Sequence, residues 1–327
     1  MQQPLFSLPT RTPALEALAA KARSFMQSAK AQATLNAYRS DFADFTDFCR
    51  QNEVEALPTS SEIVALYLVD RASTLAAATL ARRLTAINQA HRAAGFTLAP
   101  ASTKNFVVGE TLKGIRRTIG TAQVVKSPLL IPAIRTIISC TAEGLIGARN
   151  RALILTGFVG AFRRSELAAL DWEELEFCED GMVITLRRSK TDQEASGRKV
   201  GLPWGTEESL CPVRRMQDWL AASGITSGPI FRGVDRYSKL SVHGLATDSI
   251  SRILQRAAIR AGIQAGIKAG DLGAHSLRAG FVTQASLNHA TNAEIRHQTG
   301  HSSDRTLERY RRIHCVFAAN AASSLGI

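Results

Sequence analysis

The chain of 327 residues is strongly basic, with a formal net charge of +12 at pH 7 and a pI near 10.0. Hydrophobic residues make up 45% and charged residues 21%, an ordinary composition for a globular protein. No apolar run approaches the roughly 20 residues that cross a membrane, and the N-terminus lacks the pattern of a secretory signal. The five cysteines are scattered, without a CxxC pair. We therefore expect a cytoplasmic protein with free thiols and neither a disulfide framework nor a zinc site.

The excess of positive charge predicts a polyanionic partner, and nucleic acid is the leading candidate. Residues 1–118 hold 14 Lys and Arg against 9 Asp and Glu, and the remainder holds 26 against 19. The excess therefore belongs to both parts of the chain and predicts two basic domains that can each contact a duplex. A basic surface that only keeps the protein in solution is the alternative.

The N-terminal third of the chain predicts four or five short helices and no strand. Apolar residues from Leu35 onward recur at spacings of three and four, which marks one face of a helix, with Thr34 as its cap. A capping pattern opens the apolar stretch 59–72, and a further helix runs to Gly95. The last helix covers 105–120. These elements predict a small helical bundle.

Basic clusters on two of these helices are candidate DNA contacts. The residues are Arg82, Arg83, Arg116 and Arg117. A solvated helix face explains each cluster equally well when it is taken alone, so both interpretations stay open.

The weakest pattern of the chain lies at residues 119–127, which we predict to be an interdomain linker before a second domain over 128–327. Helices are predicted there over 129–142, 148–160 and 165–170. Two strands then flank the turn cluster TDQEASG and predict a hairpin. After the hairpin the pattern is helical again, with breaks at 228–231 and 262–273.

Four motifs follow one another along residues 160–310. They are GAFRRSELAALDW (160–172), RRSKTDQ (187–193), HSLRAGFVTQA (275–285) and TGHSSDRTLERY (299–310). In this order they resemble the first arginine box, the lysine hairpin, the His-x-x-Arg box and the tyrosine box of the tyrosine recombinases, the phage-integrase and Xer-type enzymes. Each motif alone is weak, and the four in order form a specific pattern.

The resemblance implies a mainly α fold with a small antiparallel β element. A helical core-binding (SAM-like) domain would occupy 1–118, and an α+β catalytic domain 128–327. The implied function is site-specific recombination of double-stranded DNA by a homotetramer on two DNA sites, without a cofactor, a metal ion or ATP. Only about ten residues precede the first predicted helix, which favours simple core sites. The implied location is the cytoplasm, at the nucleoid of a prokaryote, and a need for accessory recombination proteins stays open.

The resemblance also implies roles for individual residues. Arg163 and Arg278 would clamp the phosphate, whose non-bridging oxygens gain charge during transfer. His275 would hydrogen-bond the phosphate and help to accept the nucleophile's proton, and His301 would donate a second hydrogen bond. Glu166 would support the site by hydrogen bonding, with a capping or surface role as the alternative.

Tyr310 would be the nucleophile and form a 3′-phosphotyrosyl intermediate. A free phenol with a pKa near 10 is only about 0.1% ionised at pH 7, so the attack needs a base and a positive environment. Arginines flank Tyr310 on both sides. Lys190 would protonate the departing 5′ oxygen, with Lys199 on the returning strand as its rival.

Other interpretations have weaker support. Five of the seven histidines lie between 275 and 314, and His297 and His301 have the spacing of a zinc helix. Gly300 is predicted to end that helix, which argues against a metal site. A monomeric type IB topoisomerase, a non-catalytic DNA-binding accessory protein and a metal-dependent nuclease or transposase are the rival functions. The apolar tail 315–327 is predicted to pack on a neighbouring protomer, or equally on its own domain.

Overall fold

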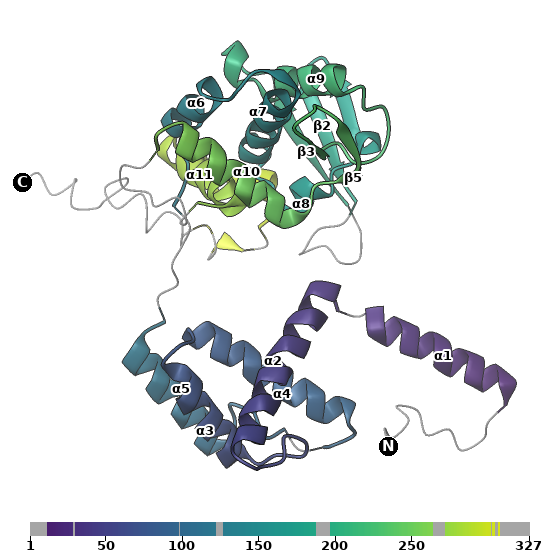
Figure 1. The fold of residues 1–327 in the computed structure, drawn as a ribbon, viewed down its shortest axis with the longest axis vertical. Coiled ribbons are helices and arrows are strands. Elements are labelled where there is room, and N and C mark those ends of the chain that lie inside the picture. The colour runs from purple at the N-terminus through teal and green to yellow at the C-terminus, as the bar shows by residue number, and fades with distance from the viewer. Residues whose placement is uncertain are drawn as a thin grey trace, which may run out of the picture. The chain divides into compact units, whose positions relative to one another are not determined.

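The computed structural model divides the chain into two compact units, Met1–Val124 and Val125–Ile327 (Figure 1). It describes residues 12–28, 30–97, 99–121, 127–187, 197–263, 272–301, 303, 304 and 307. The division falls within 119–127, the stretch predicted as a linker. The described part is mainly helical with two small antiparallel sheets, so the predicted fold class is confirmed.

The described residues of the N-terminal unit form helices joined by loops, with no strand. Its helices are α1 (Pro13–Ser28), α2 (Gln32–Gln51), α3 (Ser61–Ala72), α4 (Ala77–Ala93) and α5 (Phe106–Ile119). Helices α2 to α5 share one core, in which Phe45, Tyr67 and Leu80 are fully buried. The predicted bundle is therefore present.

Side-chain caps mark the starts of α3 and α5. The Ser60 hydroxyl accepts a hydrogen bond from Ile63 N, and the Asn105 side chain accepts from Val107 N. The cap predicted at Thr34 is wrong, because α2 begins at Gln32 and Thr34 already donates its backbone N–H to the carbonyl of Ala31. The helix begins before its apolar stripe, so the first apolar residue does not mark the N-terminus of the helix.

The C-terminal unit is built around α7. Its helices are α6 (Ile131–Ser139), α7 (Gly144–Val159), α8 (Arg164–Ala168), α9 (Pro212–Ser223), α10 (Thr247–Arg260), α11 (Ala274–Leu287) and α12 (Asn292–Thr299). Every residue from Ala152 to Phe158 of α7 is buried, and α9 and α11 pack against this helix. This stretch of α7 is therefore buried on all sides, and the helix forms the centre of the core.

Three strands form the larger sheet, in the order β1 (Leu175–Cys178), β2 (Gly181–Leu186) and β3 (Arg198–Pro203). The β2–β3 hairpin predicted from the alternating pattern is confirmed, with Leu186 opposite Arg198. Strand β1 was not predicted. It contributes only four residues, most of them exposed, and shows no clear alternation.

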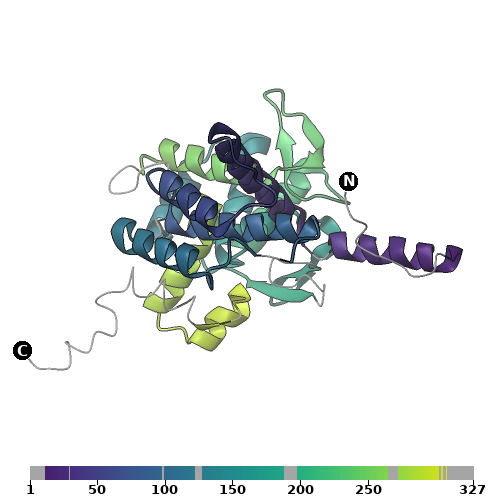
Figure 2. The ribbon, with the colours of Figure 1, turned by 90° about the horizontal axis from the view of Figure 1, so that it is seen from below.

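A second antiparallel pair, β4 (Arg232–Val234) and β5 (Leu240–Gly244), lies in a stretch predicted to be helical. That prediction is wrong because the strands are too short to show a period of two. Figure 2 shows this pair, in light green, at the periphery of the C-terminal unit. Tyr237 in its turn and Val242 on β5 are largely exposed. No helix in the described residues is long and apolar enough to cross a membrane.

Candidate active site

The first arginine motif begins with a tight turn directly after α7. Ala161 has a left-handed φ of 49°, a conformation that costs an L-residue about 1–2 kcal/mol. A Cβ on Gly160 would lie 2.2 Å from the ring of Phe162, so the ring packs directly on the glycine backbone. This turn directs the carbonyl of Ala161 towards Arg278 on α11, whose Nη1 donates to it over 2.6 Å.

Arg163 and Glu166 form a close ion pair at the start of α8. The Arg163 Nη1 atom lies 2.6 Å from Glu166 Oε1, and the Arg163 backbone N–H donates to Glu166 Oε2 over 2.8 Å. The Glu166 side chain is only 1% exposed, whereas that of Arg163 is 17% exposed. The buried carboxylate therefore fixes a guanidinium group that solvent and ligands can still reach.

His275 and Arg278 lie three residues apart on the first turns of α11, as predicted, and Arg278 is almost completely buried. Its Nη2 atom lies 3.0 Å from Nε2 of His301. His301 follows Gly300, which ends α12 with a left-handed φ of 65°, also as predicted. The turn after α12 and the start of α11 thus meet at this arginine.

The hydrogen bonds of His301 define its tautomer. Because a guanidinium group only donates, Nε2 must accept the bond from Arg278. Nδ1 lies 2.8 Å from the hydroxyl of Thr299, which itself donates to the carbonyl of Ile295. Nδ1 therefore carries the hydrogen, and His301 is neutral.

Burial and positive charge keep both site histidines neutral. Burial lowers the pKa of His301 to about 3, and Arg278 and Arg163 lower it further. Burial also lowers the pKa of His275, again with contributions from Arg278 and Arg163. The two imidazoles and the two arginines are therefore close enough to interact electrostatically, and the structure brings together five predicted site residues, Arg163, Glu166, His275, Arg278 and His301.

Sequence reasoning missed one residue of this cluster, Arg198. Its Nη1 donates to the carbonyl of Gln298 over 2.7 Å, and its Nη2 lies 3.8 Å from Glu166 Oε2. The signal was present in the predicted returning strand, because alternation places Arg198 on the same face as the buried Val200. Lys199, the rival general acid, is exposed on the opposite face.

Lys190 and Tyr310 lie outside the described residues, as does the tail 315–327. Their predicted roles therefore stay predictions. In the described part of the chain, no group of three or more His, Cys, Asp or Glu residues is arranged to hold a metal ion. His297 is exposed on α12 and His301 lies beyond its end, so the two do not share a helix.

The arginines predicted to contact DNA fall into two groups. Arg82 makes two hydrogen bonds to the buried carboxylate of Asp41, and its side chain is half exposed. Arg83 contacts Asp44 and the hydroxyl of Tyr67, and its side chain is 13% exposed. Both therefore tie α4 to α2 within the N-terminal unit.

Arg116 and Arg117 differ from this pair. Both are exposed in the last turn of α5. Within the described residues, neither makes a salt bridge or a side-chain hydrogen bond. Their charges are therefore not offset by a salt bridge to any described side chain.

The guanidinium groups of Arg163 and Arg278 and two neutral imidazoles can hold an anionic phosphate and exchange protons with it. This combination is suited to phosphoryl transfer. The profile of the phage integrase family matches residues 132–315. An integrase/recombinase XerD homolog of Selenomonas ruminantium is 36% identical over 311 residues, 95% of this chain and 90% of that protein. The chain therefore belongs to the phage integrase family, the tyrosine recombinases, which are DNA strand-transferring enzymes.

Two solved structures show the same fold. A lambda integrase dimer bound to a COC' core site is 17% identical, with a TM-score of 0.56 over 91% of this chain and 94% of that one. The XerH site-specific recombinase bound to a palindromic difH substrate is 19% identical, with a TM-score of 0.55 over 81% and 72%. At these identities the likeness extends to the fold alone, an N-terminal helical and a C-terminal catalytic domain.

Proposed function

We propose that this recombinase exchanges strands between two specific sites in double-stranded DNA through a covalent 3′-phosphotyrosyl intermediate at Tyr310. The observation that carries the proposal is the cluster of Arg163, Glu166, His275, Arg278 and His301. The Arg278–Ala161 hydrogen bond, which spans 117 residues of sequence, joins two separate motifs and supports a single shared site. That is what a shared phosphate ligand requires.

In the proposed cleavage step, the Tyr310 oxygen attacks the scissile phosphorus and the bond to the 5′ oxygen breaks. The tyrosine proton passes to His275, and Lys190 protonates the leaving 5′ oxygen. Arg163 and Arg278 bind the non-bridging oxygens, on which charge accumulates. In other phosphoryl-transfer enzymes one such arginine is worth about 10³–10⁵ in rate. The free 5′ hydroxyl of the partner strand then attacks the phosphorus of the phosphotyrosine, and the bond from phosphorus to the Tyr310 oxygen breaks. This restores a phosphodiester and the tyrosine hydroxyl without ATP.

The geometry at His301 supports a change of its hydrogen bonding when a phosphate binds. Its Nε2 accepts from Arg278. A phosphate oxygen competes for this donor, and its negative charge raises the pKa of the imidazole. His301 can then take up a proton and donate to the phosphate, the role predicted from the sequence.

We propose that both units contact DNA. Arg116 and Arg117 are the stronger candidates in the N-terminal unit because their charges are not offset. Arg82, with its half-exposed side chain, can add a contact, and Arg83 acts mainly in the fold. The lambda integrase structure contains a dimer and a related one a tetramer on a Holliday junction, which supports a tetramer on two DNA sites for this chain. The proposed substrate implies a location with the chromosome, inside the cell.

A two-site assay tests this function. DNA fragments that the full-length protein retains would be selected from a genomic library and cloned as direct repeats in one plasmid. The proposal predicts deletion of the intervening segment in the presence of EDTA. Relaxation of supercoils without deletion would favour the topoisomerase alternative, and binding without any strand breakage would favour the accessory protein. Breakage that EDTA abolishes would indicate a metal-dependent nuclease.

A further inference from the structure

Arg198 is the first residue of β3, at the end of the hairpin opposite Leu186 of β2. Its side chain is 20% exposed and turns inward, towards the cluster described above. It is not among the residues that the four motifs single out. Yet it contacts two separate parts of the candidate site, the carboxylate of Glu166 and the end of α12.

The first contact concerns charge. Glu166 binds Arg163 at 2.6 Å and lies 3.8 Å from Arg198. Its single negative charge is therefore shared between two guanidinium groups. If Arg198 were neutral, Glu166 would offset the charge of Arg163 alone, and less positive charge would face a phosphate. Among the described residues, the buried Nη2 atom of Arg198 has no hydrogen-bond partner, so its contribution to Glu166 is electrostatic.

The second contact concerns position. Arg198 Nη1 donates to the carbonyl of Gln298 at the C-terminal end of α12, where a cation is favoured. The backbone of Gly300 packs against the same guanidinium group, because a Cβ there would lie only 3.0 Å from Arg198 Cζ. His301 is the next residue. The position of the His301 turn is thus tied to the same side chain that faces Glu166.

We propose that Arg198 is a positioning residue for DNA cleavage, which keeps the charge of Arg163 available by sharing Glu166 and holds the turn that carries His301. This inference rests on the proposed function. Arg198 acts through Glu166 and Gln298 and does not bind the phosphate. Its removal should therefore slow the chemical step and leave DNA binding almost unchanged.

The test compares single-turnover formation of the protein–DNA adduct on a nicked duplex that the wild type binds and cleaves. Arg198→Met should slow adduct formation about 10²-fold, the order expected when a reacting group is misplaced by about 1 Å. Its Kd for the duplex should stay within about 3-fold, because no phosphate contact is lost. Arg215→Met is the matched control, since the Arg215 side chain on α9 is 21% exposed and forms ion pairs with Glu208 and Asp218, outside the candidate site. This control should change neither quantity.

A double-mutant cycle distinguishes action through Glu166 from a general structural role. In a Glu166→Gln background there is no carboxylate charge to share, so Arg198→Met should cost less than about 10-fold. Arg198→Lys, which keeps the charge but cannot reach both acceptors, should recover part of the wild-type rate. The melting temperature of every variant is measured alongside the rates.

Three results would overturn the inference. The first is cleavage by Arg198→Met at the wild-type rate, and the second is an equal loss of cleavage rate in the wild-type and Glu166→Gln backgrounds. The third is a rise in the Kd for DNA that accounts for the whole loss of rate. If Arg198→Met does not fold, Arg198→Lys replaces it, and a wild-type rate for that variant rejects the inference. Failure of the wild type to form any adduct on DNA that it binds would reject the proposed function itself, and this inference with it.

Discussion

Acidification should weaken the C-terminal unit through His301. Its pKa is about 3 in the folded protein and about 6.5 in an unfolded chain, so between these values only the unfolded state binds the proton. The contribution of His301 to the free energy of unfolding is fully present above pH 6.5 and is lost as the pH falls towards 3. Each pH unit within that window is worth at most about 1.36 kcal/mol.

Between pH 7 and pH 5, the free energy of unfolding should fall by about 1.9 kcal/mol if the His301 pKa shift applies in full. His301 is partly exposed, and solvent screening reduces the value to about 1 kcal/mol. The variant His301→Gln removes this contribution, because glutamine does not titrate and its carbonyl can still accept from Arg278. Wild type should therefore lose about 1 kcal/mol more than the variant over this interval.

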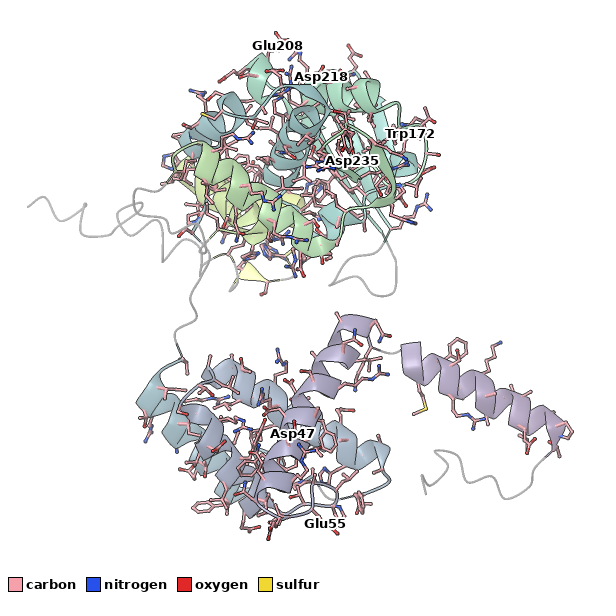
Figure 3. All side chains as sticks on the ribbon, in the orientation of Figure 1. Asp47, Glu55, Trp172, Glu208, Asp218 and Asp235 are labelled. Atoms are coloured by element: carbon pink, nitrogen blue, oxygen red, sulfur yellow. The ribbon has the colours of Figure 1, made fainter. Side chains whose placement is uncertain are left out.

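Tryptophan fluorescence during urea unfolding provides a selective assay. Trp172, Trp204 and Trp219 are the three tryptophans of the chain and all belong to the C-terminal unit. Trp172 is partly exposed near the edge of this unit in Figure 3, whereas Trp219 is fully buried. His243→Gln, which removes an exposed histidine from the same unit, is the matched control. The same pH dependence in wild type and both variants would refute the reasoning.

Two further predictions concern the backbone and the DNA surface. Gly160→Ala places a methyl group 2.2 Å from the ring of Phe162 and should destabilise the protein by about 1–3 kcal/mol in thermal unfolding followed by circular dichroism. Gly114→Ala, where no atom lies within 4 Å, should instead stabilise it by about 0.5–1 kcal/mol, and equal effects would contradict the packing argument. Arg116→Gln and Arg117→Gln should each weaken DNA binding and lower the slope of log affinity against log salt by about 1. An unchanged slope would exclude phosphate contacts at these positions.

Local patterns predicted the parts of the site that depend on neighbouring residues. The three-residue spacing of His275 and Arg278 needs only a helix, and the turn before His301 needs only Gly300. The alternation on either side of TDQEASG likewise predicted the β2–β3 hairpin. Each of these features is encoded within a few residues, so it is visible in a single sequence.

The missing parts depend on contacts between distant residues. Arg82 bonds to Asp41 and Arg83 to Asp44, pairs that are 41 and 39 residues apart, and no local pattern connects them. Both arginines therefore looked like free surface charges. Arg198 was overlooked for the same reason, since its partner on α12 is 100 residues away. Alternation gave the face on which it lies, and only the tertiary structure gave its partners.

Covalent trapping tests the central claim most directly. Wild type and Tyr310→Phe would be incubated with the same nicked duplex in EDTA, denatured, and examined for a protein–DNA adduct. The account predicts an adduct with wild type that is linked through Tyr310 and leaves a free 5′ hydroxyl, and none with the variant. The absence of an adduct in both, on DNA that both bind, would contradict it, and so would an adduct with Tyr310→Phe.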